Sequence, residues 1–380
     1  MAATSVPLAS ADPPPQVLHV LHVASAEAFA RFGRMFRQLG LALGEEGVRL
    51  ALLTDDSDAV AELDGTPLRA QLFRPLSGWG AWRLRRYLPR QFDPPPDVVH
   101  VWGTTCLGCL SDWTLRRRVA LLIYLTALRD VERLTSRGLR SNEHPLAGCP
   151  EFGQLLAERW PELAPALTVV EPGLLLPAQA PALALRGRTL GLLWTGTIDE
   201  NSGLDVLVQA VAQLRVRQCD LQLGLVGVGP ATGRVWRHVQ RECVQDCVSL
   251  IAEPKLWDRA MSGVDVCVVP ACQRDLTLAP LLAMGLGRVV IASRDQLADW
   301  FIEDQTCLQF APGSAAELAQ QVLRAAAAHP HVLAVARAAA QYVRQHHTIT
   351  RLAAQLAHKY RQLSGRQPVA TVEPEPRDVR

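Results

Sequence analysis

The chain has 380 residues, which exceeds the size at which a single hydrophobic core usually stops growing, so we expect two domains. Hydrophobic residues make up 49% and charged residues 20% of the chain, as in a folded globular protein. The formal net charge of +2 is too small to indicate a nucleic-acid partner. No apolar run approaches the ~18 residues of a membrane span, and residues 1–10 lack the pattern of a secretion signal, so we expect a cytoplasmic protein.

The nine cysteines are spread through apparent strands and helices, which indicates buried thiols rather than a disulfide framework. Cys106 and Cys109 have the spacing of a zinc or redox pair, but no second Cys or His pair completes a set of four ligands. We therefore interpret this spacing as chance at the start of a helix and expect no metal ion there.

The N-terminal half begins with residues 1–15, whose composition is typical of a disordered leader. Its first three elements form a βαβ unit, and residues 137–165 show no clear pattern. In chain order, the predicted elements are strand 17–23, helix 27–46, strand 48–54, strand 97–102, strand 120–125 and the extended segment 167–173. We place the domain boundary near Gly173.

The C-terminal half follows a linker rich in Pro and Ala over 174–187, and it alternates strands with helices. The predicted strands are 190–196, 221–226, 248–251, 264–269 and 288–292. The predicted helices are one from Gly203, one over 234–245, one from Leu278, and two late helices over 315–328 and 348–363. This alternation predicts a parallel sheet covered on both faces, followed by a polar, disordered tail over 364–380.

Three segments of this half, 190–210, 221–230 and 264–293, resemble in their order the C-terminal domain of the family 4 glycosyltransferases. The resemblance implies the GT-B fold, an α/β architecture of two Rossmann-like domains with parallel sheets that face each other across a cleft. The domain over 16–173 would hold the acceptor, and the domain over 174–363 would bind the nucleotide sugar, with its last helix returning to the first domain.

The same resemblance implies transfer of a sugar from a nucleoside diphosphate sugar to an acceptor that the sequence does not identify. Family members retain the configuration of the sugar and use neither a bound metal nor another cofactor. A nicotinamide enzyme is disfavoured, because Gly227, Gly229 and Gly233 depart from the dinucleotide-binding spacing.

The first donor loop lies between Gly196 and Gly203, at the carboxyl end of a predicted strand, where open α/β sheets bind ligands. The family carries an arginine and a lysine here, and this chain has Thr197 and Ser202 instead. Two interpretations stay open: the hydroxyls are neutral phosphate ligands, or the loop is only a strand-to-helix turn with Ser202 near the helix cap.

The second donor loop contains Gly227 and Gly229, which match the family's glycine turn beside the donor. We expect backbone amides near Gly196 and Gly229 to contribute to binding of the leaving diphosphate.

The third donor loop begins at Arg274. The family has two glutamates in this region, and this chain has Arg274 and Leu282 at their positions. We predict that Arg274, or Asp275 with a small shift of register, contacts the diphosphate, the alternative being a solvated loop arginine. Thr277 is the expected cap of the helix that starts at Leu278, whose free amides point toward the phosphate. Arg274 is also a candidate catalytic residue.

In the first domain, His100 matches the first His of a family pattern and is a candidate catalytic group on the acceptor side. The alternative is a structural histidine at a strand end. Asp56 and Asp58 have the spacing of a divalent-cation site in GT-A transferases, but a polar turn after a strand is the favoured interpretation.

The segment 79–90, from Trp79 to Arg90, interleaves aromatic residues with arginines. It is either a peripheral contact with an anionic surface at the inner face of the membrane or a solvated basic helix.

The donor-site motifs are thus degenerate, because two cations and two carboxylates of the family pattern are replaced. Their loss weakens stabilisation of the leaving diphosphate. A catalytically inactive GT-B descendant that binds a nucleotide or sugar, or serves as a scaffold, therefore stays an alternative to an active hexosyltransferase.

Overall fold

In the computed structural model of the protein, the described residues are 17–64, 66, 68–73, 95–178, 183, 185, 189–252, 257–272 and 274–365. The expected leader, the segment 79–90 and the tail beyond residue 365 lie outside them, so the expectations for these segments stay predictions. None of the helices within the described residues has the length and hydrophobicity of a membrane span.

The first domain contains a parallel sheet in the order β3-β2-β1-β4-β5-β6-β7. Its strands are β1 (Leu18–Ala24), β2 (Val48–Thr54), β3 (Arg69–Leu72), β4 (Val98–Trp102), β5 (Ala120–Leu125), β6 (Glu143–Ala147) and β7 (Thr168–Val169). Its helices are α1 (Ala26–Glu45), α2 (Ser57–Leu63), α4 (Leu107–Arg117), α5 (Leu128–Arg137), α6 (Pro150–Arg159) and the 3-10 helix η1 (Pro161–Ala166). All five residues of β4 are buried, because the sheet is covered on both faces.

The second domain contains a parallel sheet in the order β10-β9-β8-β11-β12-β13. Its strands are β8 (Leu190–Thr195), β9 (Leu221–Val226), β10 (Val248–Ile251), β11 (Val266–Val269), β12 (Val289–Ser293) and β13 (Leu308–Phe310). Its helices are α7 (Leu204–Val216), α8 (Thr232–Arg241), α9 (Trp257–Gly263), α10 (Ala279–Gly285) and α11 (Ala315–Ala326). The two domains therefore have the predicted architecture of paired Rossmann-like sheets.

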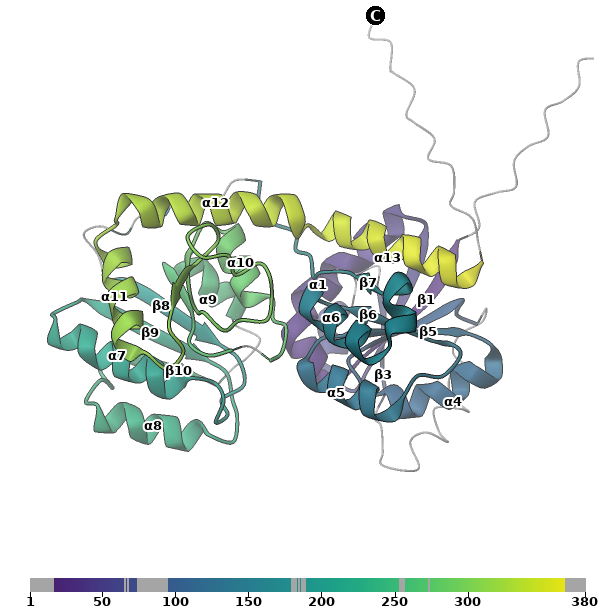
Figure 1. The fold of residues 1–380 in the computed structure, drawn as a ribbon, viewed down its shortest axis with the longest axis horizontal. Helices are drawn as coiled ribbons and strands as arrows, with labels where there is room; N and C mark the ends of the chain where they lie inside the picture. Colours follow the sequence, from purple (N-terminus) through teal and green to yellow (C-terminus); the bar gives the residue numbers. More distant parts are fainter. Residues whose placement is uncertain are drawn as a thin grey trace, which may run out of the picture.

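Two terminal helices connect the domains. Helix α12 (Pro330–His346) packs on α10 and β12 of the second domain, and α13 (Ile349–Ser364) packs on α1, β1 and β4 of the first. Figure 1 shows these helices running one after the other along the same edge of both domains. At their junction, the Leu174 amide donates to the His347 carbonyl oxygen at 2.9 Å, and the Ile349 amide donates to the Leu174 carbonyl oxygen at 3.1 Å. The two segments that connect the domains, one around Leu174 and one between α12 and α13, thus run side by side.

The structure corrects several sequence-based expectations. Residues 137–165 are not irregular, since they contain β6 and α6. Pro145 lies inside β6 and interrupts the apolar pattern by which a strand is recognised. Helix α12 was not expected, and α8 begins and ends earlier than the predicted 234–245.

Candidate functional site

A cavity of about 380 Å³ lies between the two domains. Its second-domain wall stands at the carboxyl ends of β8 and β11, which are neighbours in the sheet. The chain runs from β8 to β9 on one side, while β11 lies on the other side, so this is the point where the strand order reverses. Open α/β sheets bind ligands at such points.

Most of the predicted donor-site residues meet at this cavity. The predicted residues that line it are Gly196, Thr197, Ser202, Arg274, Asp275, Thr277 and Leu278. Two tryptophans, Trp194 at the end of β8 and Trp257 at the start of α9, add aromatic surface. A concave, largely apolar site with a few polar groups is typical of small-molecule binding.

The first loop is held against the end of β11 by Gly203. This glycine has a φ of +69°, and an added Cβ would come within 2.7 Å of the Ala271 Cβ. Only glycine therefore fits between the loop and the neighbouring strand end. The Ser202 hydroxyl donates to the Asp199 carbonyl oxygen at 2.8 Å, so it stabilises the loop itself.

Gly227 and Gly229 are not part of the cavity lining, so their assignment to the donor site stays a prediction. An added Cβ at Gly227 would lie 1.9 Å from the Gly196 carbonyl oxygen, and one at Gly229 would lie 2.1 Å from the Ile198 carbonyl oxygen. These glycines let two loops approach each other. The Gly196 amide itself donates to the Val226 carbonyl oxygen at 3.1 Å and is not available to a phosphate.

The third loop is attached to the first domain by backbone hydrogen bonds. The Leu128 amide donates to the Arg274 carbonyl oxygen, and the Leu276 amide donates to the Thr126 carbonyl oxygen, both at 2.7 Å. The Arg274 guanidinium lies 3.2 Å from the Glu132 carboxylate of α5. Arg274 is therefore at the cavity, as predicted, but it is also an interdomain contact.

The structure places the N-cap position of the helix that follows Thr277 at Leu278, one residue later than predicted. Helix α10 begins at Ala279, and its N-cap residue, Leu278, makes no capping hydrogen bond from its side chain. Pro280 lies in the first turn, where its missing N–H has no cost. Thr277 and Leu278 line the cavity just before this helix.

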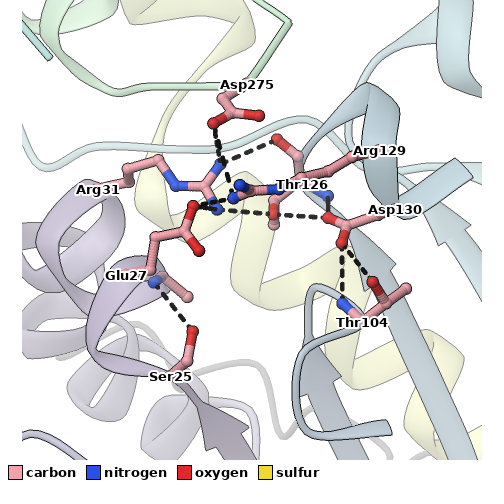
Figure 2. A network of polar contacts seen from close by, with 9 residues as sticks. Ser25, Glu27, Arg31, Thr104, Thr126, Arg129, Asp130 and Asp275 are labelled. Carbon is pink, nitrogen blue, oxygen red and sulfur yellow. Dashed lines mark hydrogen bonds and ion pairs between the residues drawn. The ribbon is translucent and has the colours of Figure 1, made fainter. Parts of the chain in front are cut away.

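A network of charged side chains forms the first-domain wall (Figure 2). Arg31 of α1 and Arg129 of α5 both lie 3.7 Å from the Asp275 carboxylate of the second domain. Glu27 lies 3.7 Å from Arg31 and is also in contact with Arg129. The two guanidinium groups meet between the two carboxylates.

Arg31 is held in place by Thr126, which is itself held by Asp130. Its guanidinium donates to the carbonyl and hydroxyl oxygens of Thr126, both at 3.3 Å. The buried Asp130 carboxylate accepts hydrogen bonds from the amide and hydroxyl groups of Thr104 and Thr126 at 2.7 to 3.1 Å. Burial lowers the pKa of Arg31, while the negative charges of Asp275 and Asp130 oppose this. Arginine nevertheless stays protonated, because its pKa starts so high.

Sequence reasoning missed Glu27, Arg31 and Arg129 as cavity residues. A usable signal exists for Arg129, because it follows the buried strand 120–125, and α/β sheets bind ligands at such strand ends. Arg31 lies in the second turn of α1, and only the tertiary structure brings it to the cavity.

His100 is not part of the cavity, so the structure does not support a catalytic role. It is fully buried, and its Nδ1 lies 2.6 Å from the Tyr360 hydroxyl of α13, which also lies 2.8 Å from Nε2 of His22. Burial and the neighbouring His22 lower the pKa of His100 well below 6.5. This histidine attaches the last helix to the first domain.

Asp56 has a structural role as the N-cap of α2. Its carboxylate accepts from the amides of Asp58 at 2.9 Å and Ala59 at 3.2 Å. Cys106 is the N-cap residue of α4, and the side chain of Cys109 is not among the parts of the chain that the structure describes. Among the described residues, no three His, Cys, Asp or Glu side chains form a group that could hold a metal ion.

Comparison with sequence families finds a match in the second domain. Residues 189–328 match the family model described as Glycosyl transferases group 1. No curated protein matches the chain.

Solved structures match nearly the whole chain. The HepE protein of Anabaena in complex with UDP-glucose is 12% identical, with a TM-score of 0.74 and coverage of 91% of this chain and 100% of that one. Sucrose-phosphate synthase from Thermosynechococcus elongatus is 19% identical, with a TM-score of 0.69 and coverage of 91% and 99%. WaaG, a glycosyltransferase of lipopolysaccharide biosynthesis, is 14% identical, with a TM-score of 0.67 and coverage of 90% and 99%.

The fold defined by these two domains is GT-B. The domain match and the fold together support assignment of the chain as a glycosyltransferase enzyme.

Proposed function

We propose that the protein is a family 4 glycosyltransferase that transfers a sugar from a nucleoside diphosphate sugar to an acceptor, with retention of configuration and without a bound metal. The observation that most supports this proposal is the cavity between the domains, at the carboxyl ends of β8 and β11. Its second-domain lining falls within the matched residues 189–328. The HepE structures with UDP and with UDP-glucose concern a protein of the same fold and make a nucleotide-sugar donor the reasonable expectation here.

The chemistry that this site must perform is departure of a nucleoside diphosphate from the sugar. Negative charge builds up on the leaving phosphate, and preorganised cations and hydrogen-bond donors lower the barrier. The lining includes the guanidinium groups of Arg31, Arg129 and Arg274, together with the hydroxyl groups of Thr197 and Thr277. In this proposal, the donor motifs have diverged from the family pattern, and the positive charges of the site come from arginines at other positions.

The test is incubation of the purified protein with UDP-, GDP- and ADP-sugars, with measurement of thermal stabilisation and of released nucleoside diphosphate. We expect one nucleotide class both to stabilise the protein and to be hydrolysed slowly or transferred. Stabilisation without turnover, with extracts of candidate acceptors present, would favour an inactive nucleotide-binding descendant. Absence of stabilisation by every nucleotide would overturn the donor site itself.

A further inference from the structure

The second-domain wall of the cavity contains little positive charge. Its polar residues at the end of β8 are Thr195 and Thr197, and Ser202 uses its hydroxyl within the loop. The one cation of this domain in the described lining is Arg274, whose side chain is 60% exposed and paired with Glu132. A diphosphate carries at least two negative charges, so neutral hydroxyls and one exposed arginine are a weak site for it.

The first-domain wall is different, because Arg31 and Arg129 bring two guanidinium groups together at the cavity. The Arg31 side chain is only 14% exposed, and its Nε is buried without a hydrogen-bond partner among the described residues. Arg129 is 42% exposed and therefore accessible to a ligand. A planar guanidinium with several donors fits phosphate oxygens better than any other side chain.

Asp275 occupies the position between these two cations. Its Oδ2 lies 3.7 Å from a nitrogen of each guanidinium, which is too long for hydrogen bonds of normal length. A carboxylate oxygen that faces two arginines stands in for one oxygen of an anionic ligand. Because the backbone of residues 274–276 is attached to the first domain independently, the Asp275 side chain can turn away without release of the loop.

We propose that Arg31 and Arg129 of the first domain bind the phosphate oxygens of the nucleoside diphosphate, in competition with the Asp275 carboxylate. This inference rests on the proposed function and adds to it the source of the phosphate-binding charge. The donor is then bound by both domains, with its leaving group neutralised from the acceptor side of the cavity. Asp275 and Glu27 together compensate the two cations when no anion is bound.

A structural role for the arginines predicts different behaviour. If they only attached the Asp275 loop to the first domain, their loss would weaken the fold or binding of every ligand alike. If they bind phosphate, their loss weakens the binding of diphosphates more than the binding of nucleosides. The ratio of affinities for a nucleoside diphosphate and its nucleoside separates the two roles.

The experiment measures binding of UDP, GDP and ADP, and of uridine, guanosine and adenosine, to the full-length protein by calorimetry. The variants are Arg129→Ala and Asp275→Asn, with Arg133→Ala as a control that removes an exposed arginine one turn further along the same helix. For the base that the wild type prefers, we expect R129A to lower the diphosphate affinity by about tenfold or more, as for loss of a charge-assisted hydrogen bond. Nucleoside affinity should change by less than about twofold, and R133A should change neither.

D275N should raise the diphosphate affinity by about two- to fivefold, because it removes the competing charge. An unchanged affinity ratio in R129A, or a lower diphosphate affinity in D275N, would overturn the inference while leaving the proposed function standing. Failure of the wild type to bind any of the diphosphates would instead overturn the proposed function.

Discussion

Leu276 of the second domain lies directly against Gly148 of the first. A Cβ added to Gly148 would come within 2.5 Å of Leu276 Cδ1 and 2.7 Å of the Leu125 carbonyl oxygen. Leu276 is only 3% exposed, although it belongs to a loop between a strand and a helix of the other domain. The loop that lines the cavity is therefore seated in a pocket of the first domain, and the missing side chain of Gly148 provides the space.

Substitution of Gly148 by Ala should destabilise this seating. The added methyl group meets both a side chain and a backbone oxygen, so the loop has to shift, and overpacking of this kind costs about 1 to 3 kcal/mol. Urea unfolding of G148A should show this loss in the free energy of unfolding. Because the loop also lines the cavity, nucleotide binding should weaken in the same variant.

Gly108 of α4 provides the matched control for that change. It lies in the first turn of a helix, and an added Cβ there would meet no atom within 4 Å. G108A should therefore leave the free energy of unfolding unchanged or raise it by up to about 1 kcal/mol. Equal effects of the two alanine substitutions would show that the Leu276 contact is not tight.

Arg274→Ala is expected to weaken diphosphate binding about three- to tenfold, with little effect on the free energy of unfolding. Arg274 lines the cavity, and both it and its partner Glu132 are 60% exposed, so their ion pair contributes little to stability. Glu132→Ala is the control, since it frees Arg274 without loss of the cation. E132A should bind diphosphate at least as well as the wild type, and an R274A variant with wild-type affinity would remove Arg274 from the donor site.

Much of the fold could be predicted because buried parallel strands have a strong local signal. Strands 48–54 and 120–125 have the predicted bounds, since each is an apolar run that ends at polar residues or a turn. Helix α12 escaped prediction because small alanines make up much of its buried face, which leaves a weak hydrophobic pattern. The strand within 137–165 was not predicted, because Pro145 and polar residues interrupt the apolar pattern of β6.

Only part of the candidate site could be predicted from the sequence. Thr197, Ser202 and Arg274 could be predicted, because strand ends followed by glycine turns mark the ligand-binding edge of a sheet. Arg31 and Arg129 belong to the other domain, and of the two only Arg129, which follows a buried strand, has a local signal in the sequence. His100 was a candidate only through a motif, whereas its burial and its contact with Tyr360 depend on the last helix, which is distant in sequence.

The Tyr360 hydroxyl should contribute substantially to stability, because it is fully buried and contacts both His22 and His100. Tyr360→Phe leaves two buried imidazole nitrogens without this partner, and we expect a loss of about 1 to 3 kcal/mol in urea unfolding at pH 7. Tyr342→Phe is a suitable control, since Tyr342 is only partly buried. A Y360F variant as stable as the wild type would contradict this role.

The same two histidines should make the protein sensitive to acid. Burial lowers the pKa of His22 from 6.5 to about 3, and burial together with the neighbouring His22 lowers the pKa of His100 well below 6.5. The unfolded chain therefore binds protons first as the pH falls below about 6.5, and the free energy of unfolding decreases, by at most about 1.4 kcal/mol per pH unit for each histidine. Urea unfolding at pH 7, 6 and 5 should show this decrease, and the double variant H22Q/H100Q should lose less over the same interval.

Glu171 should produce the opposite dependence on pH. Burial, followed by the charge of Asp299 and a hydrogen bond to it, raises the pKa of Glu171 to about 8, while the charge of Arg351 acts in the other direction. A folded-state pKa above the unfolded value of 4.5 means that this carboxyl group favours folding most below pH 4.5, and that the contribution is lost as the pH rises through 8.

Glu171→Gln removes the ionisation but keeps the shape of the side chain, so its free energy of unfolding should rise relative to that of the wild type between pH 5 and 9. Asp299→Asn removes the neighbouring charge, which lowers the pKa of Glu171 and should move the loss to lower pH. Urea unfolding of the three proteins at each pH unit gives the comparison. Parallel curves for the wild type and E171Q would mean that Glu171 ionises as readily in the folded protein as in the unfolded chain.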